Sequence, residues 1–210
     1  MANHSLPHEL AVILSHQSPL ELEIQILTVQ QPGSFEQDVW EMSVQDKWNT
    51  APVEKEAGVK LFKEGNVELA LKKFERSVMM LESLIVAGYG KNAPLEAEGK
   101  DLYGMNSTKL VSLLLASRSN YVLCKLKTGD YVSVIKQCAE VLKMDPENEK
   151  AFFRRGVAYA RLGRDLEFAK ADLTRCEKTV EVVKELKALG EKERLNKDKE
   201  KKMWNGMFTK

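Results

Sequence analysis

The feature that most constrains this chain is a helix–turn–helix unit that occurs three times after residue 53. The copies cover residues 54–78, 119–148 and 150–176, and each has two stretches of helical periodicity separated by a tight turn. Glycine opens every turn, at Gly65-Asn66, Gly129-Asp130 and Gly163-Arg164-Asp165. Small residues let paired helices approach closely, and large apolar residues fill the seams. The pattern predicts an all-α solenoid of three repeats.

The sequence on either side of the repeats follows other patterns. Residues 20–34 alternate apolar and polar side chains, which predicts a strand, and residues 8–15 form a candidate partner strand. We therefore expect four segments: a β remnant at 1–34, a linker at 35–52, the repeat domain at 53–189 and a charged C-terminal helix at 190–210. A break in that last helix is expected at Gly190. The long segment 85–110 should lengthen the helices on both sides of a loop near 91–94.

The repeats resemble the tetratricopeptide repeat, a unit of about 34 residues that stacks into a right-handed solenoid with a concave groove. The best local match comprises Pro146, Lys150, Gly156, Tyr159 and Gly163. With "VWEMSVQDKW" before the repeats and "EKKMWNGMF" at the end, the chain resembles the C-terminal region of the large FK506-binding (FKBP-type) immunophilins. That resemblance implies a three-repeat solenoid with a long capping helix. It also implies that residues 16–29 are the last strand of an isomerase domain.

The resemblance further implies a binding site. In co-chaperone repeats of this type, residues on the inner helices clamp the terminal carboxylates of an acidic C-terminal peptide of Hsp90 or Hsp70. The positions carried over to this chain are Lys55, Val59, Asn120, Lys150 and Arg154. Lys and Arg donate charge-assisted hydrogen bonds to carboxylates, and Asn donates an amide without adding charge. The resemblance thus predicts a non-enzymatic adaptor with Lys55, Asn120, Lys150 and Arg154 as its partner-binding residues.

Val59 departs from the clamp pattern, because a branched apolar side chain cannot donate a hydrogen bond to a carboxylate. The loss should weaken binding by about 1 kcal/mol. Lys150 and Arg154 alone would also fit an ordinary solvated helix face, and the matched Lys55 and Asn120 in the other two repeats favour a shared groove. Arg155 should point away from that groove and pair with a nearby acid.

Two further interpretations stay open. A weakened clamp also fits an atypical immunophilin-like scaffold that binds a specific client, such as a circadian protein kinase. The basic run 197–202, followed by Met203, Trp204, Met207 and Phe208, has a composition that calmodulin can bind, although capping of the solenoid explains the same residues. Isomerase activity is not expected, since the resemblance assigns only the last strand of an isomerase domain to this chain.

Composition narrows the remaining classes of function. Lys plus Arg number 32 and Asp plus Glu number 31, so no global field favours nucleic acid or a membrane. Cys124, Cys138 and Cys176 lack CxxC spacing and should be reduced, structural thiols. The three histidines lie within residues 4–16, around a proline, and no metal site or cofactor is expected there. No secretory pattern is visible, so we expect the protein in the cytoplasm and also in the nucleus.

Overall fold

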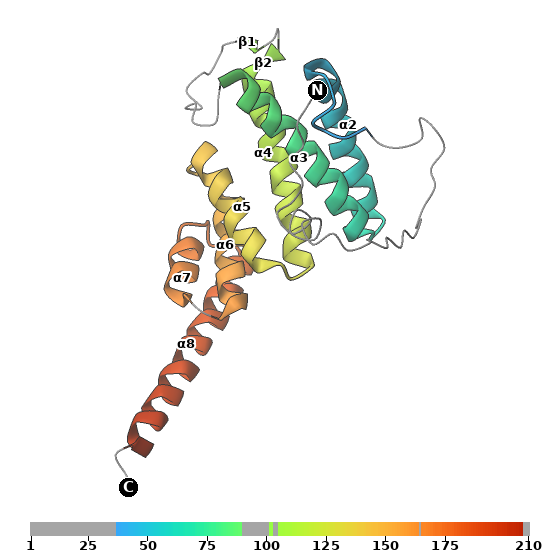
Figure 1. Cartoon of the computed structure of the whole chain (residues 1–210). Helices are drawn as coiled ribbons and strands as arrows, with labels where there is room; N and C mark the ends of the chain where they lie inside the picture. Colours follow the sequence, from blue (N-terminus) through green and yellow to red (C-terminus); the bar gives the residue numbers. More distant parts are fainter. Residues whose placement is uncertain (1–36, 90–100, 103–104, 164, 208–210) are drawn as a thin grey trace, which may run out of the picture. The chain divides into compact units, whose positions relative to one another are not determined.

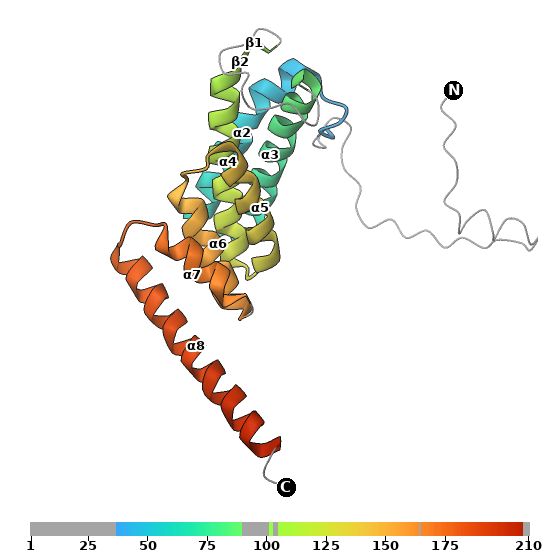
Figure 2. The ribbon, with the colours of Figure 1, turned by 90° about the vertical axis from the view of Figure 1, so that its left-hand side faces the viewer.

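The structure is a computed structural model that describes residues 37–89, 101–102, 105–163 and 165–207. The described part contains seven helices and one antiparallel pair of two-residue strands, β1 and β2 (Figures 1 and 2). The helices are α2 (Val44–Lys63), α3 (Val67–Tyr89), α4 (Ser107–Lys127), α5 (Tyr131–Met144), α6 (Glu149–Leu162), α7 (Leu166–Thr174) and α8 (Val180–Met207); the strands are Asp101–Leu102 and Met105–Asn106. None of these helices is both long enough and apolar enough to cross a bilayer.

The helices form three hairpins, α2–α3, α4–α5 and α6–α7, and each hairpin packs on the next. Their first helices also contact one another, α2 with α4 and α4 with α6, so these three form one layer. Helix α8 packs on α6 and α7 and then extends beyond them, as Figures 1 and 2 show. The predicted all-α solenoid of three repeats with a long C-terminal helix is confirmed.

The turns between paired helices have the predicted glycines. Gly65, Gly129 and Gly163 have φ values of 85°, 79° and 75°, in the left-handed region where a side chain is strained. The residues after the first two glycines cap the next helices: Asn66 Oδ1 accepts from the Leu69 amide, and Asp130 Oδ1 accepts from the Ser133 amide. These local signals explain why the hairpins could be placed from the sequence.

Close helix contacts and one buried polar link hold the repeats together. At Gly156 an added Cβ would lie 2.8 Å from Leu173 Cγ, so only glycine lets α6 approach α7 this closely. Between the first and second repeats, the buried Ser77 hydroxyl donates to the Ala51 carbonyl at 2.8 Å and lies 3.0 Å from the Ser117 hydroxyl. That link joins α2, α3 and α4 at one point beside the apolar side chains of the core.

Several expectations differ from the structure or lie outside it. Helix α2 begins at Val44, inside the segment 35–52 that was predicted to be a linker, and it contains Pro52. Helix α8 continues through Gly190, so the predicted break is wrong. A lone glycine costs a helix only about 1 kcal/mol, and packing at Leu189 offsets that cost. Helices α3 and α4 are long, with 23 and 21 residues, as predicted. The predicted β remnant and the loop near 91–94 lie outside the described residues.

Candidate functional site

Helix α2 contributes Lys55 to the candidate site. Lys55 is half-buried, and it shares one helix face with Trp48, Pro52 and Val59, which follow the spacing of three or four residues. This face and α4 enclose a groove of about 590 Å³, which we call the α2–α4 groove. Its lining residues are Trp48, Asn49, Pro52, Lys55, Lys109, Ser112, Leu113 and Ala116. Lys55 therefore lines a groove between the first helices of the first and second repeats.

Helix α6 contributes Lys150 and Arg154 to a second hollow. We call this cavity of about 370 Å³, between α4, α6 and the start of α8, the α6 pocket. It is lined by Leu123, Leu126, Glu149, Lys150, Phe153, Arg154, Cys176, Glu177, Thr179, Glu181 and Val182. Lys150 is exposed and Arg154 is half-buried. The structure thus brings together the two cations that the sequence assigned to the third repeat.

Asn120 lies on α4 between the two hollows. It is half-buried, and it follows Ala116 of the α2–α4 groove by four residues and precedes Leu123 of the α6 pocket by three. This spacing puts the three residues on one helix face. Lys55 lies on one side of Asn120, and Lys150 and Arg154 lie on the other. The four predicted residues consequently line the same layer, although no single cavity contains all of them.

Arg154 is held in place by α4, which the sequence did not predict. Its Nη1 donates to the Ser119 carbonyl oxygen at 2.8 Å and to the Ser119 Oγ at 2.6 Å. Burial lowers the pKa of the Arg154 guanidinium, and the nearby thiols of Cys138 and Cys124 act in the opposite direction. One nitrogen is occupied by Ser119, and Nε and Nη2 remain as donors for a ligand. The contact joins the second and third repeats beside Asn120.

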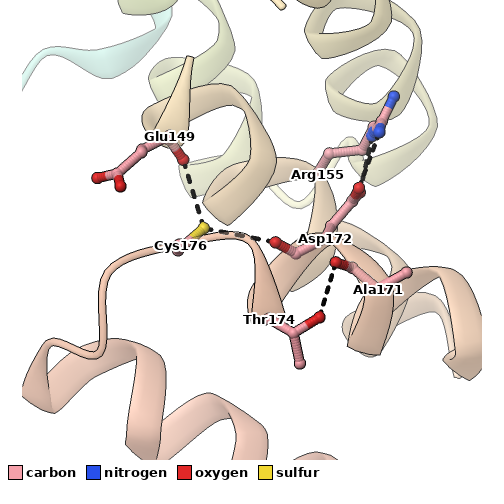
Figure 3. Close-up of polar contacts among 6 residues, drawn as sticks. All are labelled: Glu149, Arg155, Ala171, Asp172, Thr174 and Cys176. Carbon is pink, nitrogen blue, oxygen red and sulfur yellow. Dashed lines mark hydrogen bonds and ion pairs between the residues drawn. The ribbon is translucent and has the colours of Figure 1, made fainter. Parts of the chain in front are cut away.

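Arg155 pairs with a nearby acid, as the sequence predicted, and Val59 packs away from the polar part of the site. Val59 is half-buried and packs against the core formed by α2, α3 and α4, so it offers no hydrogen-bond donor to the groove. Arg155 donates to both carboxylate oxygens of Asp172, from Nε at 2.7 Å and from Nη2 at 2.8 Å (Figure 3). That bidentate pair raises the pKa of Arg155 and removes the side chain from the candidate site.

The three cysteines are free and buried, in agreement with structural thiols. Burial raises the pKa of Cys124 to about 11 and that of Cys138 to about 12. The Cys176 Sγ lies 3.6 Å from the Glu149 carbonyl oxygen (Figure 3). The described residues contain no group of three or more His, Cys, Asp or Glu side chains placed to hold a metal ion. The three histidines fall outside the described ranges.

Two lysines of α4 that sequence reasoning missed also face α2. Lys109 Nζ lies 5.7 Å from the centroid of the Trp48 ring, and Lys127 Nζ lies 4.6 Å from that of Phe62. Both lysines follow the spacing of three or four residues that includes Asn120, which is the signal that could have identified them. Helix α4 therefore presents a cation toward each end of α2.

Known proteins resemble this chain in sequence. No protein-family model matches the chain. It is 30% identical over 173 residues to aryl-hydrocarbon-interacting protein-like 1 of Bos taurus, covering 82% of this chain and 49% of the relative. It is 31% identical over 181 residues to peptidyl-prolyl cis-trans isomerase FKBP4 of Bos taurus, covering 83% of this chain and 36% of the relative. The chain thus spans half or less of the length of these relatives.

A solved structure extends the comparison to the fold. The C-terminal TPR-containing domain of a Plasmodium falciparum FK506-binding protein superimposes with a TM-score of 0.62 at 21% identity, covering 77% of this chain and 99% of that domain. TPR denotes the tetratricopeptide repeat. Sequence and fold agree, and they confirm the predicted resemblance: this chain is similar to the C-terminal tetratricopeptide-repeat domain of FK506-binding immunophilins.

Proposed function

We propose that this chain is a non-enzymatic adaptor whose layer of first helices binds the acidic C-terminal peptide of Hsp90 or Hsp70. One observation carries the proposal: cationic or amide side chains from all three repeats, Lys55, Asn120 and the pair Lys150 and Arg154, line the same layer. An extended peptide that crosses this layer meets a donor on each helix. Repeat proteins of this type commonly bind ligands along such surfaces.

The chemistry of these residues suits a carboxylate. Arg154 is already fixed by Ser119, so little side-chain entropy is lost when its remaining nitrogens bind. Lys150 is exposed, and an ion pair there is worth only about 0.2–1 kcal/mol because water screens it. Val59 removes one donor, which costs about 1 kcal/mol, or roughly a fivefold loss of affinity. The combination predicts specific binding of moderate strength.

Calorimetric titration with a peptide ending in Glu-Glu-Val-Asp tests the proposal. We expect micromolar binding to the wild-type protein, weaker binding to Lys150→Ala, and weaker binding of the same peptide with an amidated C-terminus. Lys136→Ala is the matched control, because Lys136 is an exposed lysine on α5, a second helix of its repeat. Val59→Asn should restore the missing donor and tighten binding about fivefold. No heat with the wild-type protein would refute the proposal.

The proposal also concerns enzymatic activity and the location of the chain in the cell. We propose that the chain acts in the cytoplasm and in the nucleus without isomerase activity. FKBP4, one of the relatives, is named as a prolyl isomerase, and the chain covers only 36% of it. Peptide isomerisation assayed with these 210 residues should show no turnover above the uncatalysed rate. Measurable turnover would contradict this part of the proposal.

Val59 favours a second candidate function, an atypical scaffold that binds a specific client such as a circadian protein kinase. Its apolar side chain weakens carboxylate binding while leaving the repeat surface intact. Co-precipitation distinguishes the two functions: a kinase that is still recovered with Lys150→Ala favours the scaffold. Recovery of Hsp90 that depends on Lys150 favours the chaperone adaptor.

Calmodulin is a third proposed partner, through the end of α8. Met203 and Trp204 are 61% and 55% exposed there, beside Lys199 and Lys202. Exposed Met and Trp among lysines suit calmodulin's apolar groove. Calcium-loaded calmodulin should shift the Trp204 fluorescence to shorter wavelength, and Trp204→Ala should weaken the complex. Unchanged affinity in Trp204→Ala would exclude this contact.

A further inference from the structure

The α2–α4 groove has an uneven distribution of charge. Lys55 from α2 and Lys109 from α4 both line it, and none of its eight lining residues carries a carboxylate. Within the described part of the chain, neither lysine forms an ion pair. The α6 pocket differs, because Glu149, Glu177 and Glu181 lie among its lining residues with Lys150 and Arg154. An acidic group is therefore favoured more strongly in the α2–α4 groove than in the α6 pocket.

The polar groups of this groove are arranged as donors. Asn49 Oδ1 accepts from Gln45 Nε2 at 3.1 Å, so the Asn49 amide nitrogen is left to donate. Ser112 uses its hydroxyl hydrogen on the Lys109 carbonyl at 2.9 Å. Asn49, Lys55 and Lys109 are then the side chains that can donate to a bound ligand. Lys55 belongs to the proposed site for the terminal carboxylate, so Asn49 and Lys109 remain as one neutral and one charged donor for a second carboxylate.

The rest of the groove is apolar. Trp48, Pro52, Leu113 and Ala116 supply this surface, and Lys109 Nζ lies 5.7 Å from the Trp48 ring centroid. The cation and the ring therefore face the same space. A ligand that fills it needs a carboxylate and an adjoining aliphatic or apolar part. An acidic peptide segment with an apolar neighbour has this chemistry.

We propose that the α2–α4 groove is a second acidic subsite for the bound peptide. Lys109 and Asn49 bind a side-chain carboxylate there, and Trp48 covers the apolar side chain next to it. The inference rests on the proposed function, in which Lys55, Asn120, Lys150 and Arg154 bind the terminal carboxylate. It adds a requirement on the partner, which must also carry an internal acidic residue. Lys109 becomes a specificity-determining residue.

A double-mutant cycle tests the subsite. Lys109→Ala is titrated with the Glu-Glu-Val-Asp peptide and with peptides in which each Glu is replaced by Gln, and Lys136→Ala is the matched control. We expect Lys109→Ala to weaken the parent peptide about threefold. The loss should disappear for one Gln-substituted peptide and persist for the other, and Lys109→Arg should largely restore affinity. If Lys109→Ala weakened every peptide equally, the effect would come from the overall charge of the protein, and the inference would be overturned. Unchanged affinity in Lys109→Ala would overturn it as well.

Trp48 gives a readout that is independent of the terminal carboxylate. In a Trp40→Phe and Trp204→Phe background, Trp48 is the remaining tryptophan of this chain, which contains three. An acetylated, amidated Glu-rich peptide has side-chain carboxylates without a free C-terminus, so its binding does not require the clamp. The subsite is supported by a saturable change in Trp48 emission that Lys109→Ala abolishes. This result would stand even if the wild-type protein failed to bind the free-acid peptide, which would refute the proposed function. No change in Trp48 emission would overturn the subsite by itself.

Discussion

The two cations of the third repeat should respond differently to truncation. Arg154 is half-buried and donates twice to Ser119, whereas Lys150 is exposed and forms no hydrogen bond or ion pair within the described ranges. Arg154→Ala removes both hydrogen bonds and the packing of the side-chain stem. The burial that lowers the pKa of the Arg154 guanidinium offsets part of that loss. We expect a net loss of about 1–2 kcal/mol for Arg154→Ala and a change within about 0.5 kcal/mol for Lys150→Ala.

Urea unfolding followed by circular dichroism at the helix band measures this difference. With a slope of about 2 kcal/mol per molar urea, Arg154→Ala should lower the midpoint by roughly 0.5–1 M, and Lys150→Ala should leave it almost unchanged. In a Ser119→Ala background, Arg154→Ala should cost less, because one of its two acceptors is already absent. Equal midpoints for Arg154→Ala and Lys150→Ala would refute the idea that Arg154 anchors α6 to α4. For binding experiments, Lys150→Ala is therefore the cleaner variant.

Two more predictions concern the framework. Gly156→Ala should lower the free energy of unfolding by about 1–2 kcal/mol, since the new Cβ would lie 2.8 Å from Leu173 Cγ and the gain in helix propensity is only about 1 kcal/mol. Gly190→Ala should raise the free energy of unfolding by up to about 1 kcal/mol, because nothing lies within 4 Å of the new Cβ. Urea midpoints that shift in the same direction would contradict this contrast. Cys124 and Cys138, buried and with pKa values raised to about 11 and about 12, should react with a disulfide reagent at pH 8 only after unfolding. Rapid labelling of the folded protein would show that these thiols are accessible.

Features set by nearby residues could be predicted from the sequence. Gly65, Gly129 and Gly163 mark turns because a left-handed φ is strained for other residues, and all three turns are present. The repeat pattern also placed Lys55 and Arg154 on first helices, since position within a repeat determines the helix face. These inferences needed no knowledge of how one helix packs beside the next.

Features that depend on contact between repeats were missed. Arg154 binds Ser119, which is 35 residues away, and Lys109 lies over Trp48 from another repeat. Both contacts follow from the lateral alignment of α2, α4 and α6, which helical periodicity within one segment does not determine. The α2–α4 groove could not be assembled from sequence for the same reason.

The start of α2 and the predicted break at Gly190 were both misplaced. The helical pattern was read only from residue 53 onward, and Pro52, which has no amide hydrogen to donate and costs a helix interior about 3 kcal/mol, lies inside α2. Helix α2 nevertheless begins earlier, with the Ser43 side chain accepting from the Asp46 amide at 3.1 Å, a capping signal that is visible in the sequence. Tertiary packing of α2 outweighs the proline.

The buried serine link between the first two repeats bears on how this chain tolerates change. Ser77 and Ser117 meet next to the Ala51 carbonyl, so the alignment of α2, α3 and α4 is set by a contact inside the core. The free energy of closing a loop grows only slowly with its length. The connection between α3 and α4 can therefore gain or lose residues during evolution while the groove that contains Lys55 keeps its form. A new surface segment could be acquired there without remodelling the peptide site.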